Sequence, residues 1–405
     1  MVYLPTEAIS LDSILNMKVC DMTGYSYLCS CGRRHSVDIQ RIAVGKGVIK
    51  ELPEILSDFR DKKIILVSDA NTWKIAGERV LQLLEGGGYS QVSTVFLESE
   101  DYPIVVPDER VVARLLYETS NDTSLLLAVG SGTINDVCKI VSYKMGIASA
   151  TVGTAPSMDG YASSMSPLIV NHAKVTYLSH YPYAIVCDSE IMATAPDVMF
   201  RAGFGDIVGK YTALADWQLT VKINGEYYCE TTAKLVRNAV DLCVQEAEAY
   251  MKRVPQAIDR MNEALLLSGI AMGLVGISRP ASGCEHHMAH FWELDALKKG
   301  TEHPLHGNSV GVGSIVACRA YQWMKQRYAD LWDISVPEPE YMKALYKKVG
   351  STLTPQELGV SREVFLSCMN NAYRIRPRYT IFNYAKNAGI LPELANQLTE
   401  DFYGK

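Results

Sequence analysis

Histidine is scarce in this chain and is concentrated in one stretch. Five of the eight histidines fall between His286 and His306, in a sequence of 405 residues. Within "GCEHHMAH", His286 and His290 are four residues apart, so a helix would place both imidazoles on one face and turn His287 away. Imidazoles bind divalent metal ions and relay protons near neutral pH. The stretch therefore indicates a metal centre or a proton relay, whereas any single histidine could instead cap a helix or face solvent.

A lone carboxylate and another imidazole could complete a metal site. Asp206 lies among glycines in "GFGDIVGKYTALADW", at the expected start of an apolar helical run, where an unpaired charge is costly to bury. His306 precedes Gly307 and a new helical segment. One carboxylate with imidazoles is the ligand set of a catalytic divalent ion that keeps open positions. Lys210 is expected to neutralise Asp206 rather than to meet an anionic substrate.

A glycine turn is the candidate nucleotide site. In "AVGSGTINDVCK", Gly130 and Gly132 follow an apolar strand and open a helix. The free N–H groups and positive end of that helix, with the hydroxyls of Ser131 and Thr133, suit a pyrophosphate. The spacing is neither G-x-G-x-x-G nor a Walker sequence, so a plain strand-to-helix turn stays open as an alternative.

Two other strand ends carry polar groups that could contact a ligand. Asp69 ends the strand "IILVSD" and could hold ribose hydroxyls, but the N-cap of the next helix is the simpler interpretation. The long loop "TVGTAPSMDGYASS" places small and polar side chains at the end of another strand, where α/β enzymes bind ligands. Its candidate residues are Thr154, Ser157, Asp159 and Ser163.

The elements that must position these residues alternate in the first half of the chain. Apolar, β-branched runs predict strands, and amphipathic runs between them predict helices. This alternation indicates an α/β domain with a doubly wound parallel sheet. The expected strands are 63–69, 92–98, 124–133 and 147–156, and the expected helices are 73–88, 107–120 and 134–146.

Helical periodicity dominates the second half, with few strand signals after about residue 190. We therefore predict an α/β dinucleotide-binding domain over 1–187 and an all-helical metal- and substrate-binding domain over 188–405. The first domain would carry a cysteine-bearing extension over about 1–40.

The composition excludes several functional classes. The net charge of −6 gives no attractive field for nucleic acid or an anionic membrane. The apolar stretch 264–277 is too short to span a bilayer and predicts a buried helix. Ten scattered cysteines without a recognisable secretion signal lead us to expect free thiols in a reduced, cytoplasmic protein.

The N-terminal segment "CDMTGYSYLCSCGRRH" holds four soft metal ligands in a hairpin-like setting. Cys20, Cys29, Cys31 and His35 could form a small structural zinc site. The C-x-C spacing is not that of a standard zinc knuckle, so ordinary free thiols are the expected state.

Five motifs, in order, carry a family resemblance. They are "VGSGTINDVCK", "TAPSMDGYAS", "GFGDIVGKYTALADW", "RPASGCEHHMAHFWE" and "LHGNSVGVG". Over about residues 40–400 the chain resembles the sn-glycerol-1-phosphate dehydrogenases, within the superfamily of glycerol dehydrogenase, iron-containing alcohol dehydrogenases and 3-dehydroquinate synthase. The resemblance implies a Rossmann-like domain followed by an all-α domain.

The resemblance also implies roles for individual residues. It implies one divalent metal ion, with zinc expected and nickel or iron as alternatives, bound by Asp206, His286 and His306; His303 is a rival for the third position. It assigns Asp159 and His290 to catalysis and substrate contact, with Asp206 also touching the substrate. It places NAD(P)H against Asp69, Gly130, Ser131, Gly132, Thr133, Ile134, Thr154, Ser157 and Ser163.

The implied reaction is the reversible reduction of dihydroxyacetone phosphate to sn-glycerol 1-phosphate, a step of phospholipid metabolism, by a homo-oligomer. Three other functions stay open. A polyol dehydrogenase would act on unphosphorylated glycerol, and a cyclase like 3-dehydroquinate synthase would use NAD only as a transient oxidant. A non-catalytic nucleotide-binding protein would make the histidine cluster incidental.

Overall fold

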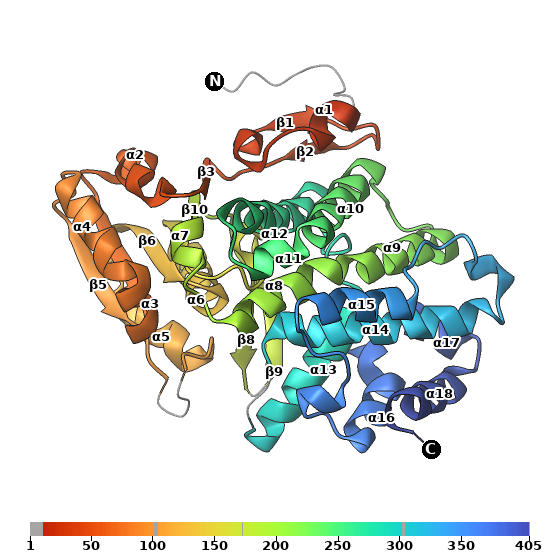
Figure 1. Ribbon diagram of the computed structural model, residues 1–405. Helices are drawn as coiled ribbons and strands as arrows, with labels where there is room; N and C mark the ends of the chain where they lie inside the picture. Colours follow the sequence, from red (N-terminus) through yellow and green to blue (C-terminus); the bar gives the residue numbers. More distant parts are fainter. Residues whose placement is uncertain (1–10, 100–103, 172, 302–303, 405) are drawn as a thin grey trace.

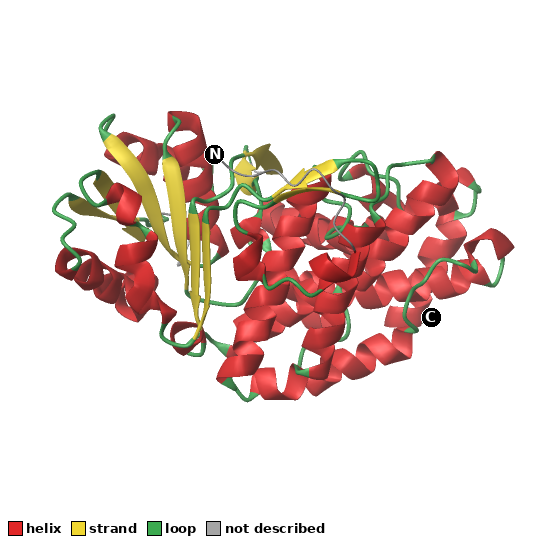
Figure 2. Ribbon diagram, turned by 90° about the horizontal axis from the view of Figure 1, so that it is seen from above, coloured by secondary structure: helices red, strands yellow, loops and turns green. Residues whose placement is uncertain are grey.

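The computed structural model describes residues 11–99, 104–171, 173–301 and 304–404. A part built around a parallel sheet lies beside a larger helical part (Figures 1 and 2). A small N-terminal hairpin lies over the helices α10 (Glu230–Gln245) and α12 (Pro255–Val275).

The central sheet has six strands, and every neighbouring pair is parallel. All four strands predicted from apolar runs are in it, and apolar clusters cover both of its faces, as a doubly wound sheet requires. The strand order is β3 (Arg41–Gly45), β10 (Ala184–Asp188), β7 (Ala148–Gly153), β6 (Thr123–Gly130), β4 (Lys63–Ser68) and β5 (Val92–Phe96).

The predicted helices between these strands are present, with adjusted ends. The expected helix 73–88 is a π-helical turn over Trp73–Gly77 followed by α4 (Glu78–Gly86). Asp108 begins α5 (Glu109–Glu118) by accepting two backbone N–H groups. Helix α6 (Gly132–Met145) ends where Gly146 takes a left-handed conformation with φ of 69°.

Two antiparallel hairpins lie outside the main sheet. The first pairs β1 (Ser26–Leu28) with β2 (Arg34–Ser36), close to the hairpin-like segment that the sequence indicated. The second pairs β8 (Met165–Val170) with β9 (Ala173–Leu178) and was not predicted. It reaches from the sheet toward α13 (Cys284–Lys299) in the helical part (Figure 1).

Beyond β10 the described residues form helices and no strand. The change falls near the predicted boundary at 187/188, and the division into two domains remains a prediction.

Within the described ranges, no helix is long and apolar enough to cross a membrane; the stretch 264–277 belongs largely to the buried helix α12. The remaining α-helices are α1 (Leu11–Leu15), α2 (Leu52–Ile55), α3 (Ala70–Thr72), α7 (Ser189–Met192), α8 (Asp197–Val208), α9 (Lys210–Asn224), α11 (Ala247–Met251), α14 (His306–Lys325), α15 (Pro339–Lys348), α16 (Arg362–Asn371), α17 (Ile381–Asn387) and α18 (Leu391–Tyr403).

Candidate metal centre and nucleotide site

The three predicted metal ligands come together from three helices. The ligand atoms of Asp206 on α8, His286 on α13 and His306 at the start of α14 all lie within 4.8 Å of one another. His286 Nε2 is 3.6 Å from Asp206 Oδ1, and the rings of His286 and His306 are 5.2 Å apart. His303, the rival ligand, lies outside the described residues. One carboxylate oxygen and two imidazole nitrogens thus face one point.

Glycines bring α8 and α14 into backbone contact and so bring these ligands together. A Cβ at Gly307 would lie 1.9 Å from the carbonyl oxygen of Ala202, and one at Gly205 would lie 2.2 Å from that of Gly307. Only glycine permits this crossing. Asp206 was predicted at the start of a helical run; this is wrong, because it lies in the last turn of α8.

Two buried glutamates orient the imidazoles. His286 Nδ1 is 2.7 Å from Glu285 Oε1, and His306 Nδ1 is 2.8 Å from Glu293 Oε1. A carboxylate at Nδ1 leaves Nε2 free for a metal ion and makes it a stronger donor. Sequence reasoning overlooked both glutamates, although they lie inside the quoted motif, directly before His286 and three residues after His290.

Lys210 neutralises the buried carboxylates, as predicted. Its Nζ, which is fully buried, lies 2.6 Å from Asp206 Oδ1 and 2.9 Å from Asp159 Oδ2. Burial alone would raise the pKa of Asp206, but the charge of Lys210 and a hydrogen bond from His286 outweigh it and hold that pKa well below its usual range. Asp206 is therefore an ionised carboxylate, the form that binds a cation.

His290 lies beside the three-ligand cluster. Its ring stacks on His306 at 5.1 Å, its Nδ1 is 3.3 Å from Glu293 Oε2, and its Nε2 is 3.0 Å from Arg376 Nη2. Burial and then the charge of Lys174 hold the pKa of His290 well below its usual value. The imidazole is therefore neutral, with its Nδ1–H toward Glu293 and its Nε2 accepting from Arg376, so a substrate hydroxyl would have to displace Arg376 to reach Nε2.

The β8–β9 hairpin contributes to this site from the sheet side. Lys174 Nζ is 2.5 Å from Glu293 Oε2, and Thr176 Oγ1 accepts a hydrogen bond from Arg376 at 3.0 Å. The first contact ties the hairpin to α13, and the second ties it to the segment before α17. No sequence signal had marked Lys174, Thr176 or Arg376 as site residues.

The glycine turn has the form that the sequence predicted. A Cβ at Gly130 would lie 2.6 Å from Ile134 Cγ1, so the turn from β6 into α6 requires glycine there. The side chain of Ser131, the N-cap of α6, makes no capping hydrogen bond. The backbone N–H of Thr154 donates to Gly130 O at 3.1 Å and joins the following loop to the turn.

The other nucleotide candidates differ in their surroundings. Asp69 caps the next helix, because its Oδ1 accepts the N–H groups of Asn71 and Thr72 at 2.8 and 2.7 Å; this is the simpler of the two interpretations. Ser163 is buried, with its hydroxyl 3.4 Å from Lys139 Nζ. Ser157 is partly exposed on the loop after β7.

The strand order brings these segments to the carboxyl edge of the sheet. Along the chain, β4 is followed by β5 on one side, and β6 then returns to its other side. At such a switch point the loops after the two strands diverge and leave a crevice at their carboxyl ends, where dinucleotides bind. Asp69 follows β4, and the Gly130 turn ends β6.

Comparisons with known proteins agree with this architecture. The family model "Iron-containing alcohol dehydrogenase" matches residues 43–196. The chain is 33% identical over 378 residues to a glycerol-1-phosphate dehydrogenase [NAD(P)+] of Bacillus licheniformis, across 90% of this chain and 94% of that one. It is also 33% identical over 368 residues to the enzyme of that name from Hyperthermus butylicus, across 90% and 97%.

The chain belongs to the glycerol-1-phosphate dehydrogenase family.

Solved structures of more distant relatives share the fold. A glycerol dehydrogenase from Schizosaccharomyces pombe superposes with a TM-score of 0.65 at 17% identity, covering 89% of this chain and 90% of that one. A probable glycerol dehydrogenase from Sinorhizobium meliloti gives 0.68 at 19% identity, covering 90% and 98%. The predicted fold class, an α/β domain with a parallel sheet followed by helices, is confirmed.

Because α8 and α14 cross so closely, we expect one added methyl group at Gly307 to reduce stability strongly. We expect Gly307→Ala to lower the free energy of unfolding by about 3 kcal/mol or more and to weaken metal binding, because backbone atoms of α8 block the new Cβ. Differential scanning calorimetry with and without metal measures both effects. Gly86→Ala is the matched control, since no atom lies within 4 Å of a Cβ there. An unchanged midpoint for Gly307→Ala would contradict this packing argument.

Proposed function

We propose that this protein is a metal-dependent NAD(P) oxidoreductase that interconverts dihydroxyacetone phosphate and sn-glycerol 1-phosphate. The observation that carries the proposal is the meeting of Asp206, His286 and His306 beside the loops at the carboxyl end of the sheet. Relatives at 33% identity that cover nine-tenths of this chain bear the name of this activity.

The donor set fits one divalent ion. Two imidazole nitrogens with fixed orientation and one ionised carboxylate suit zinc, which we propose as the metal, and nickel and iron(II) accept the same donors. When bound, the ion polarises the substrate carbonyl as a Lewis acid, while NAD(P)H supplies the hydride.

Asp159 is placed to bind a substrate hydroxyl. Lys210 and the hydroxyl of Ser268 both donate to its Oδ2, at 2.9 and 2.8 Å. Its backbone N–H donates to Asp206 Oδ2 at 3.1 Å, so the loop after β7 is fixed against the metal ligands. We assign Asp159 to orienting the substrate and His290 to exchanging the proton of the product hydroxyl.

Two arginines beside the histidines are suited to hold the substrate's phosphate. Arg279 is paired with Glu226 at 2.6 and 2.9 Å, but among the described residues neither Arg376 nor Arg378 has a carboxylate partner. Burial, and then the charges of Arg376 and Arg279, lowers the pKa of Arg378 to about 9. A phosphate dianion would relieve this repulsion and bind in the bidentate way that guanidinium groups favour.

We expect Arg376→Ala to raise the KM for dihydroxyacetone phosphate about tenfold to a hundredfold, the worth of one charged hydrogen bond of about 1.5–3 kcal/mol. Activity with unphosphorylated dihydroxyacetone should change much less, because that substrate lacks the anion. Steady-state kinetics with both substrates measures the difference. Arg374→Ala, at an exposed position two residues away, serves as the control. Equal losses with the two substrates would contradict the assignment.

Absorbance of NADH tests the proposed reaction against its rivals. We expect rapid oxidation with dihydroxyacetone phosphate and little with dihydroxyacetone or without substrate. A polyol dehydrogenase would prefer dihydroxyacetone. A cyclase or a non-catalytic nucleotide-binding protein would give no net turnover with either ketone. Either of these two results would overturn the proposal.

Three further proposals concern the cellular location, the assembly and the partner molecule of the enzyme. All ten cysteines lie in the described part of the chain and none is in a disulfide, as is usual in a reducing compartment, so we propose a cytoplasmic location. We propose a homo-oligomer on the family resemblance alone, and a small phosphorylated triose as the partner molecule.

A further inference from the structure

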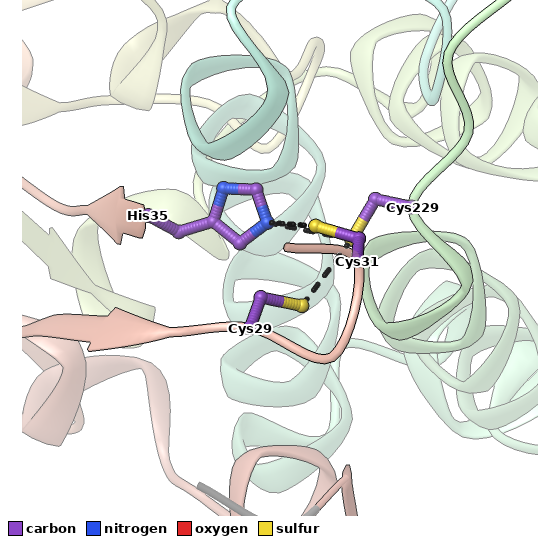
Figure 3. Close-up of side chains that lie close together, drawn as sticks. All are labelled: Cys29, Cys31, His35 and Cys229. Atoms are coloured by element: carbon purple, nitrogen blue, oxygen red, sulfur yellow. Dashed lines mark hydrogen bonds between the residues drawn. The ribbon is translucent and has the colours of Figure 1, made fainter. Parts of the chain in front are cut away.

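A second cluster of metal-binding side chains lies under the N-terminal hairpin. Cys29, Cys31 and His35 from the hairpin meet Cys229, which precedes α10, and the four ligand atoms all lie within 4.8 Å of one another (Figure 3). We propose that this cluster is a structural zinc site that fastens the hairpin to the helical part of the protein. Cys20, named as a ligand from the sequence, is not in the cluster; Cys229 takes that place from far along the chain.

The spacing of the four atoms matches a tetrahedral site. Zinc bonds of about 2.3 Å to sulfur and 2.0–2.1 Å to nitrogen give tetrahedron edges of about 3.8 Å between sulfurs and about 3.6 Å between sulfur and nitrogen. The sulfurs of Cys29 and Cys229 are 3.7 Å apart. His35 Nε2 lies 3.3 Å from the sulfur of Cys31 and 3.4 Å from that of Cys229. A disulfide would need sulfurs about 2.05 Å apart.

The local fold builds this arrangement from a short turn. The β1–β2 pairing sets Tyr27 opposite His35 and places the cysteines in the connecting loop. That loop closes through a hydrogen bond from the Gly32 N–H to Cys29 O, with Gly32 at φ of 83°. A left-handed residue after the second cysteine turns the chain back, so both thiols face His35.

Hydrogen-bond donors surround the sulfurs, as metal-bound thiolates require. The hydroxyl of Thr232 donates to the sulfur of Cys229 at 3.2 Å, and the Tyr227 hydroxyl lies 3.1 Å from the sulfur of Cys31. Cys229 is the N-cap of α10, where the positive end of the helix dipole favours a thiolate. Cys29 Sγ also lies 3.4 Å from the hydroxyl oxygen of Thr231.

The site is closed, which indicates a structural role. Cys29, His35 and Cys229 are 3%, 1% and 0% exposed, so four protein ligands would leave no position for a substrate. The two strands of the hairpin have three residues each, and so short a hairpin is marginally stable by itself. Bonds from its turn to Cys229 would hold it against the helices.

Metal analysis of the full-length protein, purified under reducing conditions without chelator, tests the proposal. Loss of the catalytic ion through His286→Ala should leave one zinc per chain. Cys229→Ser and Cys31→Ser should each remove about one equivalent of zinc and lower the melting temperature, with the His286 site still loaded. Cys20→Ser, a nearby cysteine outside the cluster, should keep the full zinc content.

Cobalt substitution supplies a readout that does not depend on the variants folding. The Asp206, His286 and His306 set contains no sulfur, so thiolate-to-cobalt charge-transfer bands in wild-type protein can come only from a thiolate site. We expect these bands in wild type and in the His286→Ala variant. Their absence, zinc-free His286→Ala protein, or a Cys29–Cys229 disulfide found by mass spectrometry of alkylated peptides would each overturn the proposal.

Discussion

His286→Ala is expected to lower kcat for dihydroxyacetone phosphate at least about a thousandfold while the protein stays folded. The substitution would remove one of the three side chains proposed to hold the ion, which would supply electrostatic stabilisation to the reaction, and loss of one such contact costs about a hundredfold to a thousandfold. It also leaves Glu285, which His286 contacts at 2.7 Å, without that partner. Steady-state kinetics, bound metal and circular dichroism together measure the effect.

A neighbouring histidine provides the control for this variant. His287 lies on the same helix and is fully buried, but neither of its ring nitrogens has a hydrogen-bond partner among the described residues. His287→Ala should reduce stability through a cavity and keep the catalytic metal. If His286→Ala retained wild-type turnover with its metal content reduced by one equivalent, the metal would have no part in the reaction.

Lys210→Met is expected to destabilise the metal-free protein by about 3–5 kcal/mol, the cost of breaking a buried ion pair. Lys210 is the ion-pair partner of both Asp206 and Asp159, and removing it would leave two carboxylates close together in the protein interior. Bound metal should reduce the loss, because the cation neutralises Asp206. Chemical denaturation with and without metal measures the difference.

The control for Lys210→Met lies on the same helix. Lys222 pairs with Asp333 at 2.6 Å on the protein surface, where solvent screens the pair, so Lys222→Met should change stability little. A small loss for Lys210→Met in metal-free protein would show that the two carboxylates find other partners. A loss that metal does not reduce would argue against an ion at Asp206.

The predictable parts of the fold are those specified by local sequence patterns. A few consecutive residues are enough to predict the apolar runs of β4, β6 and β7 and the glycine after α6. The β8–β9 hairpin was missed because apolar and polar residues alternate weakly in its strands, which pair with each other and bridge Asp108 at Ile169 instead of joining the main sheet. The sequence "GFGD" predicts the start of a helix, but in the structure Asp206 lies in the last turn of α8. Its glycines instead serve a helix crossing, which depends on Ala202 and Gly307.

Contacts across long stretches of chain limited what could be predicted of the sites. The candidate metal ligands could be predicted because the types and order of their motifs are distinctive. Cys229 could not be predicted as a ligand, since nothing in its own segment points to a hairpin two hundred residues earlier. Arg376 reaches His290 and Lys174 reaches Glu293 from separate elements, and these contacts follow only from the folded arrangement.

Anomalous X-ray scattering from a crystal of the metal-loaded enzyme tests the central claim most directly. We expect a peak at the metal absorption edge about 2.0–2.2 Å from a carboxylate oxygen of Asp206 and from Nε2 of His286 and His306. A neighbouring set, His290, Glu293 and His306, also brings three ligand atoms within 4.8 Å of one another. A peak there, or none near Asp206, would contradict the account.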